Sequence, residues 1–317
     1  MLNNQDFTRN RVDFIGGSDV AAILGLSPYK TAVDIWLEKT GQTTIQSTSM
    51  AMRFGQFAEE FIAREYVRAT GQAVAPYEEA FIDQDHPYLA GHIDRFILPK
   101  EGGLFNSTNM LSVQKLLECK TANPFAQQEW GDVGTDSVPL PYLVQCLWYL
   151  MLTGCESADL AVLFGNSDFR IYTIGRDAEV ERALKERACH FWQCYIQTGI
   201  APPAANEADC RTLFQKAIPS KIQEADQNDL DLLDQLKTIN QKLLSYEEQL
   251  SQIKQTLMNK MQDAESLQYQ GKTLLTWKAP KPSKKLDAKL LAQAHPELVA
   301  QYQMEIENTR RFVVKGL

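Results

Sequence analysis

Apolar residues recur three or four positions apart in four segments of the first 200 residues, and this spacing predicts amphipathic helices. The predicted helices are 31–41, 51–70, 141–154 and 180–199. In 51–70 the apolar positions are Phe54, Phe57, Ala58, Phe61, Ile62 and Tyr66. Glycines at 41, 71 and 154 provide helix stops.

Shorter apolar runs lie between these helices and predict strands. They are 80–83, 89–98, 112–122 and 158–174, the last being a hairpin that turns at Gly165. Residues 99–110 form a turn-rich connection. The order of helix, three strands, helix, two strands and helix predicts an α/β sheet with helices packed on it.

The pattern changes after the proline-containing segment 201–210. Beyond it an apolar seam alternates spacings of four and three, with Leu232, Leu236, Ile239, Leu243, Tyr246, Leu250, Ile253 and Leu257. A helix over about 228–264 would be about 55 Å long. Its seam could pair with another part of this chain or self-associate as a coiled coil. The predicted domains are therefore a core, 1–215, and a helical extension, 216–317, that closes with a small α/β element.

That closing element comprises a strand or hairpin near 269–277, a short helix near 296–303 and a basic strand at 310–315. Its basic stretches, KAPKPSKK and RRFVVK, could contact DNA or a protein partner.

Composition restricts the function classes only weakly. The net charge of −8 argues against a non-specific nucleic-acid coat protein, which needs a basic surface. No secretory leader or membrane-spanning apolar run is evident, and none of the six cysteines forms a CxxC pair. These features favour a cytoplasmic protein with reduced thiols.

Charged residues interrupt one buried strand in LLECKTA, residues 116–122. Glu118 and Lys120 stand two apart and therefore share a face of the strand. A buried ion pair is a poor stability device, because the desolvation of its charges can exceed their attraction. A divalent cation that neutralises the carboxylate would explain the pair better.

Asp94 interrupts the apolar run 89–98 in the same way. Two carboxylates on neighbouring strands would form a hard oxygen site suited to Mg²⁺ or Mn²⁺. Lys120 could then activate a water or stabilise the charge of a pentavalent phosphate. The pattern of an aspartate followed by Glu-x-Lys on a strand is typical of metal-dependent PD-(D/E)xK nucleases, although Glu-x-Lys alone is weak.

The segment IGGSDVAAILG, residues 15–25, predicts a second polar site. Ser18 and Asp19 are good N-caps for the helix that follows. Backbone N–H groups at a glycine turn, backed by a helix N-terminus, favour an anion.

Four blocks of this sequence resemble the YqaJ-type viral recombinase family, relatives of lambda exonuclease. They are 11–36, 54–66, 92–94 with 117–120, and 141–154, and the resemblance extends over roughly residues 7–200. One departure is Ile93, which stands where a proline is often found. The resemblance implies a restriction-endonuclease-like mixed central sheet flanked by helices, with the long helix as an addition.

The resemblance also implies roles near the metal. Glu59 would be a metal ligand, and the Cys119 carbonyl would complete the coordination shell. Gln145 and Tyr149 stand four apart on one helical face and, with Tyr142, would contact the DNA strand or the attacking water. The alternatives are a surface acid for Glu59 and a buried amide that satisfies the backbone for Gln145.

Arg11 and Ser18 stand at the separation with which relatives hold a terminal 5′-phosphate. By resemblance they would receive that phosphate here, and Lys30 would contact the DNA backbone. The alternative is a surface arginine and an N-cap serine.

The implied function is a Mg²⁺-dependent exonuclease of phage or prophage recombination. It would digest the 5′-ended strand of duplex DNA and leave 3′ overhangs for a single-strand annealing partner. Relatives form trimeric rings, so a homo-oligomer in the bacterial host cytoplasm is expected. The alternatives are a structure-specific or single-strand endonuclease and a catalytically silent DNA-end binding module.

Overall fold

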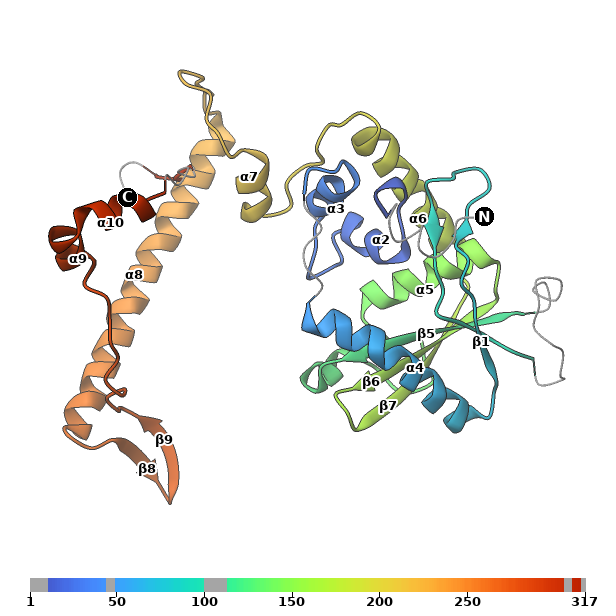
Figure 1. Ribbon diagram of the computed structural model, residues 1–317, viewed down its shortest axis with the longest axis horizontal. Coiled ribbons are helices and arrows are strands. Elements are labelled where there is room, and N and C mark those ends of the chain that lie inside the picture. Colours follow the sequence, from blue (N-terminus) through green and yellow to red (C-terminus); the bar gives the residue numbers. More distant parts are fainter. Residues whose placement is uncertain (1–10, 44–48, 100–112, 305–309, 315–317) are drawn as a thin grey trace. The chain divides into compact units, whose positions relative to one another are not determined.

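The computed structural model describes residues 11–43, 49–99, 113–304 and 310–314 (Figure 1). The chain divides into two compact units, unit 1 (Met1–Phe214) and unit 2 (Gln215–Leu317). The connection predicted at 99–110 lies almost wholly outside the described residues. Within those residues no helix combines the length and the apolar character that crossing a membrane requires.

Unit 1 is built around a mixed five-stranded sheet in the order β1-β4-β5-β6-β7. The strands are β1 (Val74–Pro76), β4 (Arg95–Ile97), β5 (Lys115–Ala122), β6 (Ser157–Phe164) and β7 (Asp168–Gly175). Strands β5 and β6 are parallel, and the other neighbours are antiparallel. The predicted mixed sheet flanked by helices, followed by a long helix, is confirmed.

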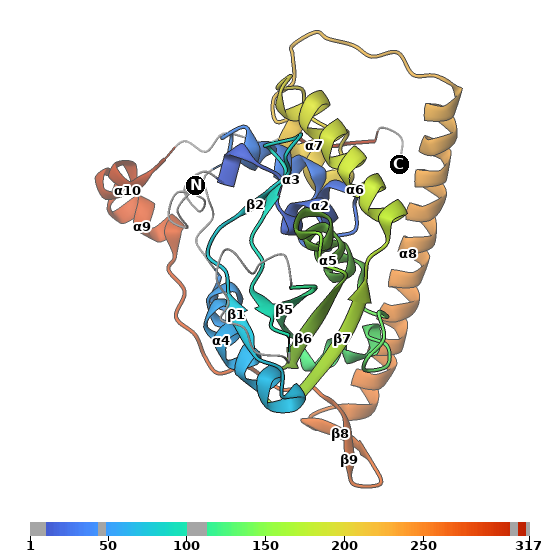
Figure 2. The same cartoon turned by 90° about the vertical axis from the view of Figure 1, so that its right-hand side faces the viewer.

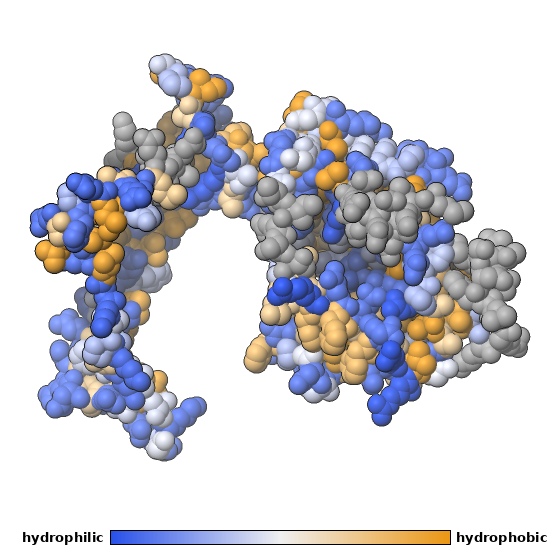
Figure 3. All heavy atoms as spheres, in the orientation of Figure 1, coloured by the Kyte–Doolittle hydropathy of each residue, from blue (hydrophilic) through white to orange (hydrophobic). Residues whose placement is uncertain are grey.

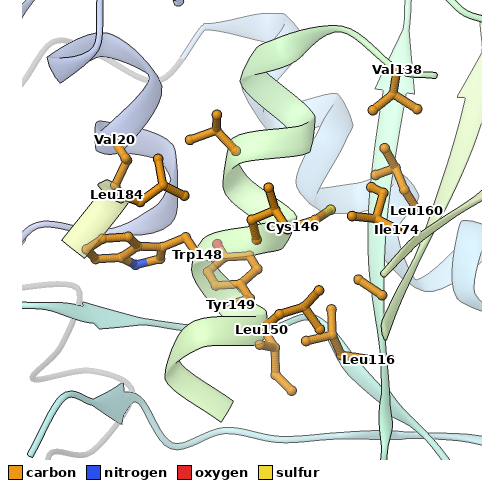
Figure 4. Close-up of a cluster of buried hydrophobic side chains, with 14 of the residues drawn as sticks. Val20, Leu116, Val138, Cys146, Trp148, Tyr149, Leu150, Leu160, Ile174 and Leu184 are labelled. Atoms are coloured by element: carbon orange, nitrogen blue, oxygen red, sulfur yellow. The ribbon is translucent and has the colours of Figure 1, made fainter. Parts of the chain in front are cut away.

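Helices cover both faces of this sheet. Helix α5 (Leu140–Thr153) joins the parallel pair β5 and β6, and α2 (Gly17–Ile23) and α6 (Ala178–Phe191) pack against it. Helix α4 (Met50–Thr70) covers the opposite face. Figure 4 shows the core on the α5 face, with Trp148 beside Leu184 on one side of α5 and with Leu116 and Leu160 at the strands on the other. The remaining elements of unit 1 are η1 (Arg11–Asp13), α3 (Ala32–Lys39), η3 (Pro124–Glu129), the π-helix η4 (Trp192–Ile196) and α7 (Glu207–Leu213).

The alternation of side chains along β5 and β6 separates the two cores. Leu116 joins the core on the α5 face, whereas Leu117 and Cys119 join Ala58, Ile62 and Tyr66 of α4. Glu118 and Lys120 lie in phase with Leu116, so they point toward α5. The same alternation that builds the sheet therefore delivers two charged side chains to the α5 face.

Helix α4 is confirmed, but only part of its apolar pattern is buried. Phe54, Phe57 and Phe61 are 46%, 81% and 51% exposed, so the spacing does not identify core residues there. These side chains form an exposed aromatic stripe, and apolar surface gathers over α4 in Figure 3. The buried face instead uses Ala58, Ile62, Ala63 and Tyr66.

Two local predictions are wrong. The run 89–98 is not one strand, because β3 (Ala90–Gly91) pairs with β2 (Phe81–Ile82) and β4 joins the central sheet. Asp94 lies at the break between β3 and β4. In α2 the N-cap is Gly16, and Ser18 and Asp19 lie inside the first turn, where the Asp19 carboxylate accepts a hydrogen bond from the Gly16 N–H.

Unit 2 contains α8 (Gln227–Met261), the hairpin of β8 (Ser266–Tyr269) and β9 (Lys272–Thr276), α9 (Ala288–Ala294) and α10 (Pro296–Tyr302) (Figure 2). The long helix, the hairpin and the last short helix match the predictions. The predicted basic strand is wrong for 310–314, which form no strand.

Candidate active site

Strand β5 holds the charged pair that the sequence predicts. The Lys120 ammonium donates to Glu118 Oε1 at 2.5 Å, and Gln145 Nε2 from α5 donates to the same oxygen at 2.8 Å. The Glu118 side chain is 2% exposed and that of Lys120 is 25% exposed. Gln145 reaches Glu118 because α5 covers the face of β5 to which Glu118 points.

Asp94 joins this pair through the register of β4 and β5. Arg95 lies opposite Leu117 in an antiparallel pair, so Asp94 falls beside Glu118. The Cys119 backbone N–H donates to Asp94 Oδ2 at 2.7 Å. Because Asp94 precedes the paired segment of β4, its side chain can turn toward Cys119 inside β5 and accept this bond.

Glu59 approaches from α4. Arg95 Nη1 donates to Glu59 Oε1 at 2.8 Å, and the side chain of Glu59 is 34% exposed. Its neighbour Glu60 is more exposed and accepts from Arg95 Nη2 at 3.1 Å. Arg95 thus fixes the candidate acid Glu59 near Asp94.

The protonation equilibria of this group reflect an excess of buried negative charge. Burial, followed by the negative charge of Glu118, raises the pKa of Asp94 to about 7. Burial also raises the pKa of Glu118, against the charge of Lys120, and burial together with the charge of Asp94 raises the pKa of Glu59. Burial lowers the pKa of Lys120, but the charges of Glu118 and Asp94 outweigh it and hold that pKa above its ordinary value.

One oxygen of this group lacks a donor. Glu118 Oε2 is buried and accepts no hydrogen bond from any described residue. Buried carboxylate oxygens normally have partners, so this atom suggests a ligand. Nevertheless, no three His, Cys, Asp or Glu side chains among the described residues already stand in the arrangement of a metal site. Hydrogen bonds from Arg95, Cys119 and Lys120 account for the present directions of the three carboxylates.

Arg11 and Ser18 lie together at a pocket of about 190 Å³. Arg11 Nη2 donates to Ser18 Oγ at 2.7 Å. The pocket is lined by Arg11, Phe14, Gly16, Gly17, Ser18, Gly91, His92 and Tyr149. Its cationic, donor-rich wall suits an anion.

A buried ion pair, which the sequence reasoning missed, supports this pocket. Lys39 Nζ lies 2.7 Å from Asp19 Oδ2, both side chains are 1% exposed, and Lys39 also donates to the Arg11 carbonyl oxygen at 2.8 Å. Asp19 Oδ1 lies 3.5 Å from Arg11 Nη2. Lys39 reads in the sequence as an ordinary basic residue in the last turn of a helix, so no local signal predicts its role.

Tyr149 links the pocket to the acidic group. Its ring lines the pocket, and its hydroxyl accepts a hydrogen bond from Gln145 Nε2 at 3.0 Å. A Cβ atom at Gly17 or Gly91 would lie 2.8 or 2.9 Å from Tyr149 Cε1, so glycine is needed at both positions for the ring to fit. Two hydrogen bonds, from Gln145 to Tyr149 and from Gln145 to Glu118, therefore connect the pocket to the acidic group.

Two candidate residues are not held in this network. Lys30 pairs with Glu38 at 2.5 Å and does not line the pocket. Tyr142 stacks on Trp130 with ring centroids 5.2 Å apart, and burial raises its pKa.

Comparison with known proteins identifies the domain that carries this site. Residues 6–156 match the family model for the YqaJ-like viral recombinase domain. The chain carries a YqaJ-like viral recombinase domain. The matched segment contains every candidate residue described above, from Arg11 to Tyr149.

Known proteins are similar to this chain either in sequence or in structure. The uncharacterized protein YqaJ of Bacillus subtilis is 28% identical over 321 residues, which cover 99% of this chain and 95% of that protein. An alkaline exonuclease from Laribacter hongkongensis is similar with a TM-score of 0.48 and 15% identity, over 62% of this chain and 94% of that chain. A phage-related exonuclease from Haemophilus somnus has a TM-score of 0.43 and 14% identity, over 58% and 94% of the two chains.

Proposed function

We propose that this protein is a Mg²⁺- or Mn²⁺-dependent deoxyribonuclease that digests duplex DNA from its ends. The observation that supports the proposal is that the register of β4 and β5 sets Asp94 beside Glu118, whose carboxylate the Lys120 ammonium contacts. Arg95 holds a third acid, Glu59, from α4. Carboxylates that share a site and an ammonium group fit metal-assisted hydrolysis of a phosphodiester.

The donor set fits a hard divalent cation. Asp94, Glu118 and Glu59 supply carboxylate oxygens, the kind of ligand that Mg²⁺ and Mn²⁺ prefer. Glu118 Oε2 is buried and accepts no hydrogen bond from the part of the chain that the structure describes, and the Cys119 carbonyl would complete the set. When bound, the cation would neutralise charge on the scissile phosphate and acidify water.

The side chains around the acids would position the reacting groups. Lys120 holds a positive charge where the phosphate gains negative charge in the transition state. Gln145 is anchored on Glu118 and Tyr149, so its amide can orient the DNA strand or the attacking water. Tyr142 also lies on α5 and would contact the same DNA strand, and Lys30 would contact the DNA backbone.

The pocket of Arg11 and Ser18 supports digestion from a 5′ end. A terminal 5′-phosphate carries more negative charge than an internal phosphodiester and would receive charged and neutral hydrogen bonds there. The link through Tyr149 and Gln145 would place the bond to be cleaved close to that end. We therefore propose that the 5′-ended strand is removed and that 3′ overhangs remain.

The viral recombinase domain suggests the biological context. The overhangs would be substrates for a single-strand annealing protein during phage or prophage recombination in the bacterial cytoplasm. A homo-oligomer, a trimer by family resemblance, would enclose the duplex and keep digestion processive.

The test uses linear duplex DNA labelled at either end and closed circular duplex DNA, each with Mg²⁺. We expect nucleotides to be released from the 5′-ended strand of the linear DNA and the circles to stay intact. Asp94→Ala should lose both this release of nucleotides and the binding of Mn²⁺. Cleavage of circles would instead indicate an endonuclease. End binding without release of nucleotides would indicate a silent binding module.

A further inference from the structure

Helix α8 of unit 2, drawn in Figure 1, carries an apolar seam over residues 232–257, and most of the seam is exposed. Six members of the α8 seam are between 51% and 66% exposed, and two are half-buried. The α8 seam consists of Leu232, Leu236, Ile239, Leu243, Tyr246, Leu250, Ile253 and Leu257. These residues form two interleaved rows. Within each row a residue recurs every seven positions, over four heptads.

A helix of this kind needs a partner. Of the 35 residues of α8, only Met261 is buried. Most helix stability in proteins comes from packing an apolar face rather than from intrinsic propensity. The seam therefore represents packing surface that unit 2 itself leaves open among the described residues.

We propose that the α8 seam is the interface of a parallel, in-register coiled coil between copies of this chain. The flanking charges support this occupant. In the heptad set by the seam, Lys242 occupies position g and Glu247 occupies position e of the next heptad. In a parallel in-register pair, a g residue faces the following e residue of the other helix, so Lys242 meets Glu247 on both sides.

The alternative orientation lacks this complementarity. In an antiparallel pair with full overlap of α8, Lys242 faces Gln249 and Glu247 faces Asn240. Neither charge then meets an opposite charge. Interhelical e and g pairs set partner choice and orientation in coiled coils, so the parallel arrangement is favoured.

The seam residues also favour more than two strands. The a row is leucine throughout, at positions 236, 243, 250 and 257, and two of the four d positions are isoleucine. Leucine at a with isoleucine at d shifts the preference from two strands to three or four. Unit 2 would then join several nuclease units into one assembly.

Adjacent leucines provide a matched test in the full-length protein. Leu243 lies in the seam and is 53% exposed, whereas Leu244 lies outside it and is 60% exposed. The molar mass in solution, measured by light scattering, should be a multiple of 35.9 kDa for the parent. A monomeric parent chain overturns the proposal.

A second readout isolates α8 from any association through unit 1. Nitrogen-14 and nitrogen-15 copies are mixed, unfolded and refolded together, and treated with a zero-length carbodiimide cross-linker. We expect a Lys242–Glu247 cross-link between isotopically different chains. Leu243→Asp should reduce its yield about tenfold or more, whereas Leu244→Asp should retain it. An absent inter-chain cross-link in the parent, or an equal loss in both variants, overturns the proposal.

Charge exchange tests the orientation. Lys242→Glu or Glu247→Lys alone places like charges opposite each other in a parallel pair and should lower the mass or the thermal stability of the oligomer. The double exchange should restore both values. Failure of the double variant to restore them overturns the parallel register.

Discussion

The Lys39–Asp19 and Lys120–Glu118 pairs of unit 1 both contain a buried carboxylate, but their surroundings differ. Lys39 and Asp19 lie 2.7 Å apart beneath the Arg11 pocket, and Lys120 and Glu118 lie 2.5 Å apart on β5. Both carboxylate oxygens of Asp19 have partners, because Oδ2 accepts from Lys39 and the Gly16 N–H and Oδ1 faces Arg11. Burial raises the pKa of Asp19, but the charges of Lys39 and Arg11 outweigh it and lower that pKa.

The second pair carries unmatched negative charge. Glu118 Oε1 accepts two hydrogen bonds, whereas Oε2 accepts none from the described residues. Asp94 and Glu59 add two more carboxylates nearby, and burial raises the pKa of all three acids. The comparison indicates that Lys39–Asp19 is complete without a ligand, whereas Lys120–Glu118 remains electrostatically incomplete in a way that a divalent cation would correct.

The largest expected effect is a loss of nuclease activity when the Lys120–Glu118 pair is changed. Glu118→Gln keeps the shape of the side chain but removes one charge from the acidic group. We expect Mg²⁺-dependent digestion of linear duplex to slow by about 10³-fold, the scale on which a group that stabilises transition-state charge contributes. Mn²⁺ should also cease to raise the unfolding temperature, because a bound ligand stabilises only when it binds. Digestion rates and thermal unfolding with and without Mn²⁺ measure both.

The contrast with the first pair sharpens this result. Metal-free Glu118→Gln should lose less unfolding free energy than Asp19→Asn, because it relieves repulsion among buried acids. A greater loss in Glu118→Gln would contradict the charge imbalance inferred for β5.

Asp19→Asn should have the largest effect on stability. Breaking a buried ion pair leaves Lys39 without its counter-charge and costs about 3–5 kcal/mol. Because the pKa of Asp19 is lowered on folding from its ordinary value of 3.8, its contribution is fully present above that pH and is lost as pH falls through the folded pKa. Denaturant unfolding followed by tryptophan fluorescence reports mainly on unit 1, since Trp277 alone of the five tryptophans lies outside it. The difference between parent and variant should narrow below about pH 3.8, and a difference constant with pH would contradict this role.

Sequence patterns predicted most of the helices and strands and the charged pair of β5, because residue alternation fixes which side chains share a face. They did not predict the break at Asp94, since Ile93 and Phe96 are buried on both sides of it and apolar alternation reports burial rather than strand pairing. The same limit explains α4, where spacing alone did not separate Phe57, 81% exposed, from Ile62. Lys39 was missed because its burial depends on contacts with Arg11 and Asp19, which lie at least 20 residues away.

Arg11→Ala should weaken the selection of DNA ends. The side chain is half exposed at the pocket and donates to Ser18. A charged hydrogen bond contributes about 1.5–3 kcal/mol, so the preference for 5′-phosphorylated over 5′-hydroxyl ends should fall about 10- to 100-fold. The ratio of kcat/KM for the two ends measures this preference. Arg64→Ala is the control, because Arg64 is an exposed α4 residue paired with Glu60, and it should leave the ratio unchanged.

The smallest effect tests the link between the two buried pairs. Tyr149→Phe removes the hydroxyl that accepts from Gln145 but keeps the ring that fits between Gly17 and Gly91. A neutral hydrogen bond contributes about 0.5–1.5 kcal/mol net, so kcat should fall about 2- to 10-fold while the preference for a 5′-phosphate persists. Gly17→Ala should lower both, because its Cβ would lie 2.8 Å from Tyr149 Cε1 and displace the ring from the pocket wall. If Tyr149→Phe instead changed the end preference and left kcat intact, Tyr149 would serve the Arg11 pocket alone and the two sites would act independently.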